Sequence, residues 1–262
     1  MNKDTIAFRQ ENHLIHSVVF SKDRAMQLDG LLQSMSKYAP QLKSVVVIYA
    51  ATTADSSRAY DVLASEQPGV LVPETRDFRR DVVAAINQNH LNLPLTMMLV
   101  DDDLFYRPLP EFDLEPNTTF ATRLGHNCTY HYMSNSPQVV PRGLCGDGGG
   151  GDFDYPASLD GQVYRTSELL PLLRECRYAN PNELEDALWR SFKARLLFAK
   201  HSCLVGIPHN SVGTYQSNRH AGGSAAELTK LYLKGWRMDL DSMDFSAVIG
   251  AHQEIPYKWR RA

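Results

Sequence analysis

The chain has 262 residues, of which 43% are hydrophobic and 22% charged, a composition that excludes a fibrous, repetitive or disordered protein. The formal net charge of −3 gives no overall basic surface, so we expect no nucleic-acid partner. The cysteines at 128, 145, 176 and 203 are scattered without a C-x-x-C pair, which predicts reduced thiols and neither a zinc nor a redox motif.

The N-terminal segment MNKDTIAFRQENH is polar, and no later apolar run has the length of a membrane span. We therefore expect a cytoplasmic protein. The basic and aromatic C-terminal run YKWRR at 257–261 resembles segments that contact anionic membrane surfaces. It predicts a peripheral contact with the inner face of a membrane.

The first half of the sequence alternates apolar runs with amphipathic periods, as in repeated β-α units. The run HSVVF at 16–20 is followed by the polar SKDR and by helical spacing of apolar residues over 28–35. The run SVVVIY at 44–49 is apolar throughout, which is typical of a strand buried on both faces of a parallel sheet. Further elements are expected near 58–65 (helix), 70–72 (strand), 78–89 (helix) and 95–100 (strand). Because crossovers between parallel strands are right-handed, these units predict a doubly wound, mostly parallel sheet flanked by helices.

The second half is rich in Tyr, His, Asn and Gly, which predicts a loop-rich region. Its segment CGDGGGGD at 145–152 is expected to be a mobile loop, and it lacks the Gly-Lys-Ser/Thr ending of a P-loop. The clearest helix is expected after Pro181, with Asn182 as N-cap, Glu185 as capping-box partner, and Leu184 to Leu196 supplying its apolar face. Other elements are expected at 118–123, 161–164 and 203–207 (strands) and at 167–175 and 225–234 (helices).

Three adjacent carboxylates, Asp101, Asp102 and Asp103, follow the apolar run LTMMLV. Ligands of open α/β sheets bind at the carboxyl ends of strands, so these acids are expected at a binding site. Like charges this close repel one another, and a bound divalent cation, Mn²⁺ or Mg²⁺, would neutralise them and leave positions open for a diphosphate. The alternative is an acidic turn that merely ends a strand.

Three segments in this order resemble the GT-A family of glycosyltransferases: SVVFSKDRAMQLDGLLQSM, LTMMLVDDDLFY and NPNELEDALW. They are similar to the family's nucleotide-binding strand-loop-helix, its D-x-D motif and its later acidic motif. Together they span about residues 16 to 190, and the likeness is to GT2-like enzymes, with some similarity to exostosin-type transferase domains. The resemblance implies a Rossmann-like GT-A domain that transfers a sugar from a nucleoside-diphosphate carrier.

The resemblance also implies roles for individual residues. Asp103 would bind the metal directly, Asp102 would support it, and Asp101 would contact the ribose or base. Asp186 would be the catalytic base, beside Glu185 in the donor site, although acids in a first helical turn are also favoured by the helix dipole alone. The remaining candidates for donor contact are Ser21, Asp23, Arg24, Arg76, Arg79 and Asp160.

Several of these residues also have ordinary structural explanations. Arg24 is alternatively a solvated residue of a first helical turn, and Arg76 and Arg79 are alternatively surface ion-pair partners of nearby aspartates. Asp160 is alternatively part of a turn before a strand. His209 would be a third metal ligand, with His220 as the competing candidate and a plain surface loop as the alternative.

We therefore expect a single domain with three parts: a nucleotide-sugar half at about 14–105, an acceptor and catalytic half at 106–250, and a basic tail at 251–262. The expected reaction moves a hexose or related sugar from a UDP-sugar, or alternatively a GDP-sugar, to a glycan or lipid-linked acceptor, as in polysaccharide or glycoconjugate synthesis. A sugar nucleotidyltransferase is an alternative, but SVVFSKDR lacks the glycine-rich loop it requires. A non-catalytic carbohydrate-binding protein would leave the acidic motifs without a role.

Overall fold

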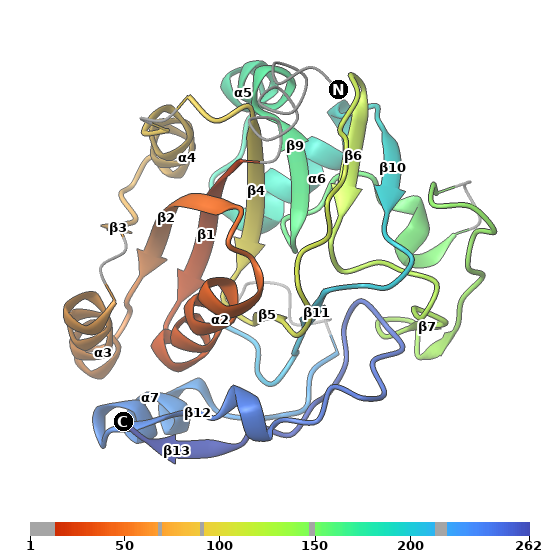
Figure 1. Ribbon diagram of the computed structural model, residues 1–262. Coiled ribbons are helices and arrows are strands. Elements are labelled where there is room, and N and C mark those ends of the chain that lie inside the picture. The colour runs from red at the N-terminus through yellow and green to blue at the C-terminus, as the bar shows by residue number, and fades with distance from the viewer. Residues whose placement is uncertain (1–13, 68–69, 90–91, 147–149, 213–218) are drawn as a thin grey trace, which may run out of the picture.

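The computed structural model describes residues 14–67, 70–89, 92–146, 150–212 and 219–262. Within them, seven strands form one central sheet in the order β10-β6-β9-β4-β1-β2-β3 (Figure 1). In chain order the strands are β1 (Ile15–Lys22), β2 (Leu42–Ala50), β3 (Val70–Pro73), β4 (Leu95–Val100), β6 (Thr118–Ala121), β9 (Gln162–Arg165) and β10 (Arg195–Phe198). Among these described strands, β9 alone runs antiparallel to its neighbours, β4 and β6.

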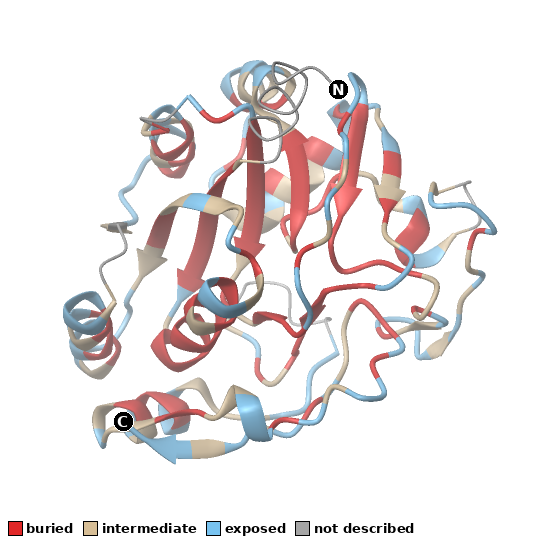
Figure 2. Ribbon diagram, in the orientation of Figure 1, coloured by how far each residue is buried: buried red, intermediate tan, exposed pale blue. Residues whose placement is uncertain are grey.

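Helices cover both faces of the sheet, because successive side chains of each strand point to opposite faces. On β4, Met97 and Leu99 belong to the same buried cluster as side chains of α2 (Ala25–Tyr38) and α3 (Ala54–Glu66). Met98 belongs to the cluster that includes side chains of α4 (Phe78–Asn87), α5 (Thr166–Glu175) and α6 (Pro181–Ser191). The strands at the centre are buried along most of their length (Figure 2). The helices are α2 (Ala25–Tyr38), α3 (Ala54–Glu66), α4 (Phe78–Asn87), α5 (Thr166–Glu175), α6 (Pro181–Ser191) and α7 (Ala225–Leu233). The predicted fold class, a mostly parallel α/β sheet flanked by helices, is confirmed.

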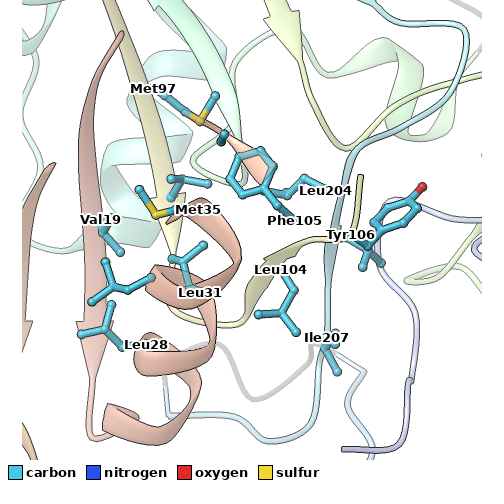
Figure 3. Close-up of a cluster of buried hydrophobic side chains, with 14 of the residues drawn as sticks. Val19, Leu28, Leu31, Met35, Met97, Leu104, Phe105, Tyr106, Leu204 and Ile207 are labelled. Carbon is cyan, nitrogen blue, oxygen red and sulfur yellow. The ribbon is translucent and has the colours of Figure 1, made fainter. Parts of the chain in front are cut away.

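A short two-stranded sheet holds the segment that follows the acidic triplet. Strand β5 (Asp103–Phe105) pairs antiparallel with β11 (Leu204–Gly206), so that Asp103 lies opposite Gly206. Leu104 and Phe105 gather with Leu204 and with apolar side chains of α2 in a buried cluster (Figure 3). This packing fixes the chain immediately after β4.

The remaining short elements lie outside the main sheet. They are β7 (Tyr130–His131) with β8 (Ser136–Pro137), β12 (Trp236–Met238) with β13 (Trp259–Arg261), and two 3-10 turns at Gly151–Asp154 and Leu240–Ser242. Residues 147–149 of the predicted glycine-rich loop lie outside the described residues. Over the ranges that the structure describes, no helix is long and apolar enough to span a bilayer.

The start of α6 differs from the prediction. The N-cap is Asn180, whose Oδ1 accepts a hydrogen bond from the Glu183 backbone N–H, and Glu183 in turn accepts one from the backbone of Ala179. The predicted cap at Asn182 and the predicted capping-box role of Glu185 are therefore wrong. The reason is Pro181, which fits the first helical position because no partner is needed there for its missing N–H.

The strand order places a topological switch point between β1 and β4. The chain runs from β1 through β2 to β3 on one side, then crosses to the other side of β1 for β4. In open α/β sheets, the crevice outside the carboxyl ends of such strands is where ligands bind. Because β9 runs antiparallel, its amino end, at Asp160 and Gly161, lies at the same edge as the carboxyl ends of β4 and β6.

Candidate active site

A cavity of about 520 Å³ lies at this edge of the sheet. Its walls come from segments far apart in the sequence: the ends of β1, β4 and β6, the start of β9, the first turns of α6, and the chain after β11. Among the lining residues are Ser21, Lys22, Arg24, Asp101, Asp102, Arg123, Tyr155, Asp160, Asn182, Glu185, Asn210, Arg219, His220 and His252. Of the predicted site residues, Ser21, Arg24, Asp101, Asp102, Asp160 and Glu185 are therefore brought together.

Arg24, at the N-terminus of α2, is a buried cation that lines the cavity. Its Nη1 donates to Asp101 Oδ1 at 2.9 Å and to Asp102 Oδ2 at 3.1 Å, and its Nε donates to Asn210 Oδ1 at 2.7 Å. The side chain is 10% exposed. Burial opposes its charge, but Asp102 and Asp101 raise the pKa of Arg24 above its ordinary value. The site therefore holds a permanent positive charge against two carboxylates.

Asp101 braces the loop that follows β1. Its Oδ2 accepts hydrogen bonds from Ser21 Oγ at 2.9 Å and from the Lys22 backbone N–H at 3.1 Å, while its Oδ1 accepts from Arg24. Burial raises the pKa of Asp101 to about 6, against the lowering effect of Arg24. Both oxygens thus have donors within the protein, and Asp101 shapes the cavity wall.

Asp103 is fully buried and is not among the residues that line the cavity. Its Oδ2 accepts from the Val100 backbone N–H at 3.1 Å, and its Oδ1 is buried without a hydrogen-bond partner among the described residues. Burial, followed by the charge of Asp160, raises the pKa of Asp103 well above its ordinary value. The pairing of β5 with β11 accounts for this inward position.

The acidic triplet was predicted to hold Mn²⁺ or Mg²⁺, and its geometry tests that prediction. Across the described ranges, no three histidine, cysteine, aspartate or glutamate side chains converge as metal ligands. Hard cations require several oxygen ligands at once. Here Arg24 bridges Asp101 and Asp102, and the unsatisfied Oδ1 of Asp103 faces inward. In this arrangement the residues do not fit a ready cation site, because the protein supplies its own cation.

A second charged cluster surrounds Asp160 at the start of β9. Asp160 Oδ2 accepts from Arg123 Nη1 at 2.9 Å and lies 3.1 Å from His252 Nε2. Burial alone would raise the pKa of Asp160, but the His252 hydrogen bond and the Arg123 charge lower it. Burial acts to lower the pKa of His252, but the hydrogen bond to Asp160 raises it above its ordinary value. The pair therefore favours an ionised carboxylate beside an imidazolium.

Glu185 and Asp186 lie on different sides of α6. Glu185 lines the cavity, and its Oε1 accepts from Ser158 Oγ at 2.8 Å and from the Leu159 backbone N–H at 3.1 Å. Burial, and then the charge of Asp160, raises the pKa of Glu185. Asp186, predicted as the catalytic base, is not among the lining residues; its side chain is 48% exposed and pairs with Arg190 at 3.3 Å.

Four further predicted residues do not line the cavity. Asp23 accepts from the backbone and hydroxyl of Thr52 at 2.7 and 2.6 Å, which ties the β1 loop to the β2 loop. Arg76 is exposed, and Arg79 donates to backbone carbonyls at the end of α5 at 3.5 Å. The ring of His209 lies 4.8 Å from that of Tyr257, and burial lowers its pKa. His220, the competing histidine, does line the cavity.

Arg123 and His252 are among the site residues that the sequence did not predict. Arg123 ends the predicted strand at 118–123, so its position at a strand end was a usable signal. His252 is 92 residues from its partner Asp160, and the sequence holds no local sign of that contact.

No protein-family model matches the sequence, and a search of curated proteins finds no match. Among the solved structures that resemble the fold distantly are two cytidylyltransferase-type enzymes and a protein named TarS. 4-Diphosphocytidyl-2C-methyl-D-erythritol synthase from Anaerococcus prevotii has 11% identity and a TM-score of 0.44, over 87% of this chain and 99% of its own. TarS from S. aureus has 14% identity and a TM-score of 0.45, over 73% of this chain and 36% of its own.

The third is CTP:phosphocholine cytidylyltransferase (LicC) from Streptococcus pneumoniae, with 8% identity and a TM-score of 0.44, over 74% of this chain and 93% of its own. Likenesses at this distance carry no argument about activity.

Proposed function

We propose that this chain is a glycosyltransferase that moves a sugar from a nucleoside-diphosphate sugar to a hydroxyl group of a glycan or lipid-linked acceptor. The observation that carries the proposal is the cavity at the switch point, which combines a buried arginine with a carboxylate of raised pKa. The arginine suits the binding of an anionic donor, and the carboxylate of raised pKa suits the role of general base.

The donor is assigned to the side of the cavity formed by β1, α2 and β4. Arg24 and Lys22 line it, and the N-terminus of α2 adds the positive end of a helix dipole. Lys22 and the helix N-terminus favour a diphosphate, because cations and helix N-termini both stabilise phosphate charge, and Arg24 offsets the two carboxylates beside them. Asp101 and Asp102 keep Arg24 in place.

Glu185 is assigned as the base that activates the acceptor. As the acceptor oxygen bonds to the anomeric carbon, the bond from that carbon to the diphosphate oxygen breaks and the hydroxyl proton passes to Glu185. Its raised pKa makes it a better proton acceptor than an ordinary glutamate, and Oε1 is held by two donors. Glu185 takes the role predicted for Asp186 because, of these two acids, Glu185 is the one that lines the cavity.

Asp160 is proposed to bind sugar hydroxyls, held in its ionised form by Arg123 and His252. A preference for UDP over GDP stays a prediction of the sequence resemblance. The resemblance also predicts a requirement for Mn²⁺ or Mg²⁺, which the contact of Arg24 with Asp101 and Asp102 does not support. No step above passes through a metal.

The test is release of nucleoside diphosphate from UDP-, GDP- and dTDP-sugars by wild type, Glu185→Gln and Asp186→Asn. We expect Glu185→Gln to lower kcat by about 10²- to 10⁴-fold, the usual contribution of a general base, with little change in the KM for donor. Asp186→Asn should stay close to wild type. Wild-type rates in Glu185→Gln would contradict the assignment, and pyrophosphate release from a nucleoside triphosphate and a sugar phosphate would instead show a nucleotidyltransferase.

A further inference from the structure

Trp189, on α6, is an exposed aromatic residue beside the cavity. Its side chain is 48% exposed, and its ring lies nearly parallel to that of Tyr155, at 19° and 6.3 Å between centroids. Single exposed apolar side chains are common on protein surfaces and need no explanation alone. This one differs because its stacking partner, Tyr155, lines the cavity.

The helix continues the cavity wall outward to Trp189. Asn182, Glu185 and Trp189 are spaced by three and four residues, which places them on one face of α6. Asn182 and Glu185 line the cavity. The face therefore runs from polar groups inside the cavity to an indole at its mouth, with the proposed base between them.

Tyr155 joins the two parts of this surface. The charge of Glu185 acts on its phenol, and after burial it is the largest influence raising the pKa of Tyr155. The other two tryptophans, Trp236 and Trp259, are half-buried, against Arg261 and Tyr257 respectively. Of the three, Trp189 is the one that offers a ring to a ligand next to the proposed base.

We propose that Tyr155 and Trp189 form the platform for a pyranose ring of the acceptor, an assignment that rests on the proposed function. An aromatic face carries negative charge density and attracts the weakly positive C–H groups on one face of a pyranose. The sugar hydroxyls are then directed to the polar groups of the same helix face, including Glu185. The acceptor class is accordingly a glycan, bound through the ring next to the attacking hydroxyl.

The test is calorimetric titration of the full chain with methyl glucopyranoside, galactopyranoside, mannopyranoside and N-acetylglucosaminide, each as both anomers. We expect at least one to bind wild type, Trp189→Ala to weaken that binding by roughly tenfold, the scale of one aromatic contact, and Trp189→Phe to weaken it less. Leu144→Ala is the matched control, because Leu144 is 49% exposed and lies outside the cavity. Titration with UDP- and GDP-sugars should be unchanged by all three substitutions.

A second measurement separates the platform from a structural role. A Trp236→Phe/Trp259→Phe variant retains Trp189 as its single tryptophan, since the chain has three. Its fluorescence should change saturably with the pyranoside that binds. Equal pyranoside affinity in Trp189→Ala and wild type, or binding of nucleotide sugars without binding of any pyranoside, would overturn the platform and leave the proposed function standing. Failure of wild type to bind any nucleotide sugar would count against the proposed function instead.

Discussion

Glu185 and Asp160 are two carboxylates of one cavity whose surroundings shift their pKa values in opposite directions. Burial dominates at Glu185 and raises its pKa, whereas at Asp160 the hydrogen bond from His252 and the charge of Arg123 outweigh burial and lower it. Paired acids whose environments separate their pKa values are a common basis for divided roles in catalysis. The division here is a proton-accepting Glu185 and an Asp160 whose ionised form is favoured.

This division predicts the pH dependence of the reaction. The base must be ionised, so kcat/KM should rise with pH through the raised pKa of Glu185, above the range of an ordinary glutamate. The Ser158 hydrogen bond lowers that pKa, so Ser158→Ala should move the acid limb of the pH profile to higher pH. Asp186→Asn should leave the limb in place. A limb that does not respond to Ser158→Ala would exclude Glu185 as its source.

The same shift has a consequence for stability. A raised pKa means that the folded chain holds the Glu185 proton more tightly than the unfolded chain. Its contribution to the free energy of unfolding is therefore fully present below the pKa of an unfolded glutamate and is lost as the pH rises through the folded pKa. Ionised Glu185, the form needed for proton acceptance, is therefore less favourable for folding than protonated Glu185.

At the scale of elements, the reversal of β9 positions Asp160. The chain turns into this strand at Gly161, which has a positive φ of 67° and whose N–H donates to the Met98 carbonyl at 2.9 Å. A β-carbon at Gly161 would lie 2.4 Å from Thr122 Oγ1 and 2.8 Å from Leu204 Cδ2. Only glycine fits this close approach.

We therefore predict that Gly161→Ala destabilises the protein by about 1–3 kcal/mol and lowers kcat/KM, because the adjacent Asp160 is displaced. Gly150→Ala is the matched control: Gly150 also has a positive φ, of 87°, but nothing lies within 4 Å of an added β-carbon. Urea denaturation of both variants measures the difference. Equal midpoints would mean that the close contact at Gly161 has no energetic weight.

The strands and helices of the sheet were largely predictable from the sequence, whereas the exact ends of α6 were not. Apolar periods located most strands and helices of the sheet, because burial on one or both faces gives a strand or helix a periodic apolar pattern. They missed β10: Leu196, predicted on the apolar face of the helix after Pro181, lies in this strand, and α6 ends at Ser191. The start of α6 was misplaced because Pro181 was read as preceding the helix. Successive residues of a helix point in directions that differ by roughly 100°, so Glu185 and Asp186 face different sides of α6. A motif match does not show which of the two faces the cavity. The packing of α6 on the Ser158–Leu159 backbone makes that choice.

At the scale of the whole molecule, the C-terminal segment reaches back to the cavity. The backbone on either side of His252 pairs with Gly206 on β11, and the His252 ring meets Asp160. Tyr257 packs on His209, and the last strand, β13, pairs with β12. These contacts join residues that are far apart in the chain and leave no local pattern in the sequence. The sequence therefore predicts only a membrane contact for the tail.

We predict that deletion of residues 251–262 lowers the melting temperature and weakens nucleotide-sugar binding, because it removes both His252 and Tyr257. Deletion of 259–262 alone keeps these residues and should retain more of both properties. Calorimetric melting and titration of the two truncations test this. Equal behaviour of the two would show that His252 and Tyr257 add nothing beyond the loss of β13. Cosedimentation with anionic vesicles, lost in both truncations, would support the predicted membrane contact.

The two halves of the sequence contribute to one sheet, since β6, β9 and β10 extend the sheet that β1 to β4 begin. The cavity likewise takes residues from both halves, with Arg24 and Asp101 from the first and Asp160 and Glu185 from the second. We propose accordingly that the predicted nucleotide-sugar and acceptor halves act as a single domain. Donor and acceptor would then meet within one cavity.

The most direct test of the central claim is the melting temperature of the chain in the presence of UDP-, GDP- and dTDP-sugars, each with and without Mn²⁺. A ligand that binds only the folded state raises stability by about 2.7 kcal/mol at a hundred times its Kd. We predict that at least one nucleotide sugar raises the melting temperature more than its free sugar or nucleoside does, and that Arg24→Lys, which loses the Nε hydrogen bond to Asn210, reduces the rise. A melting temperature unmoved by every nucleotide sugar, with and without Mn²⁺, would contradict the account.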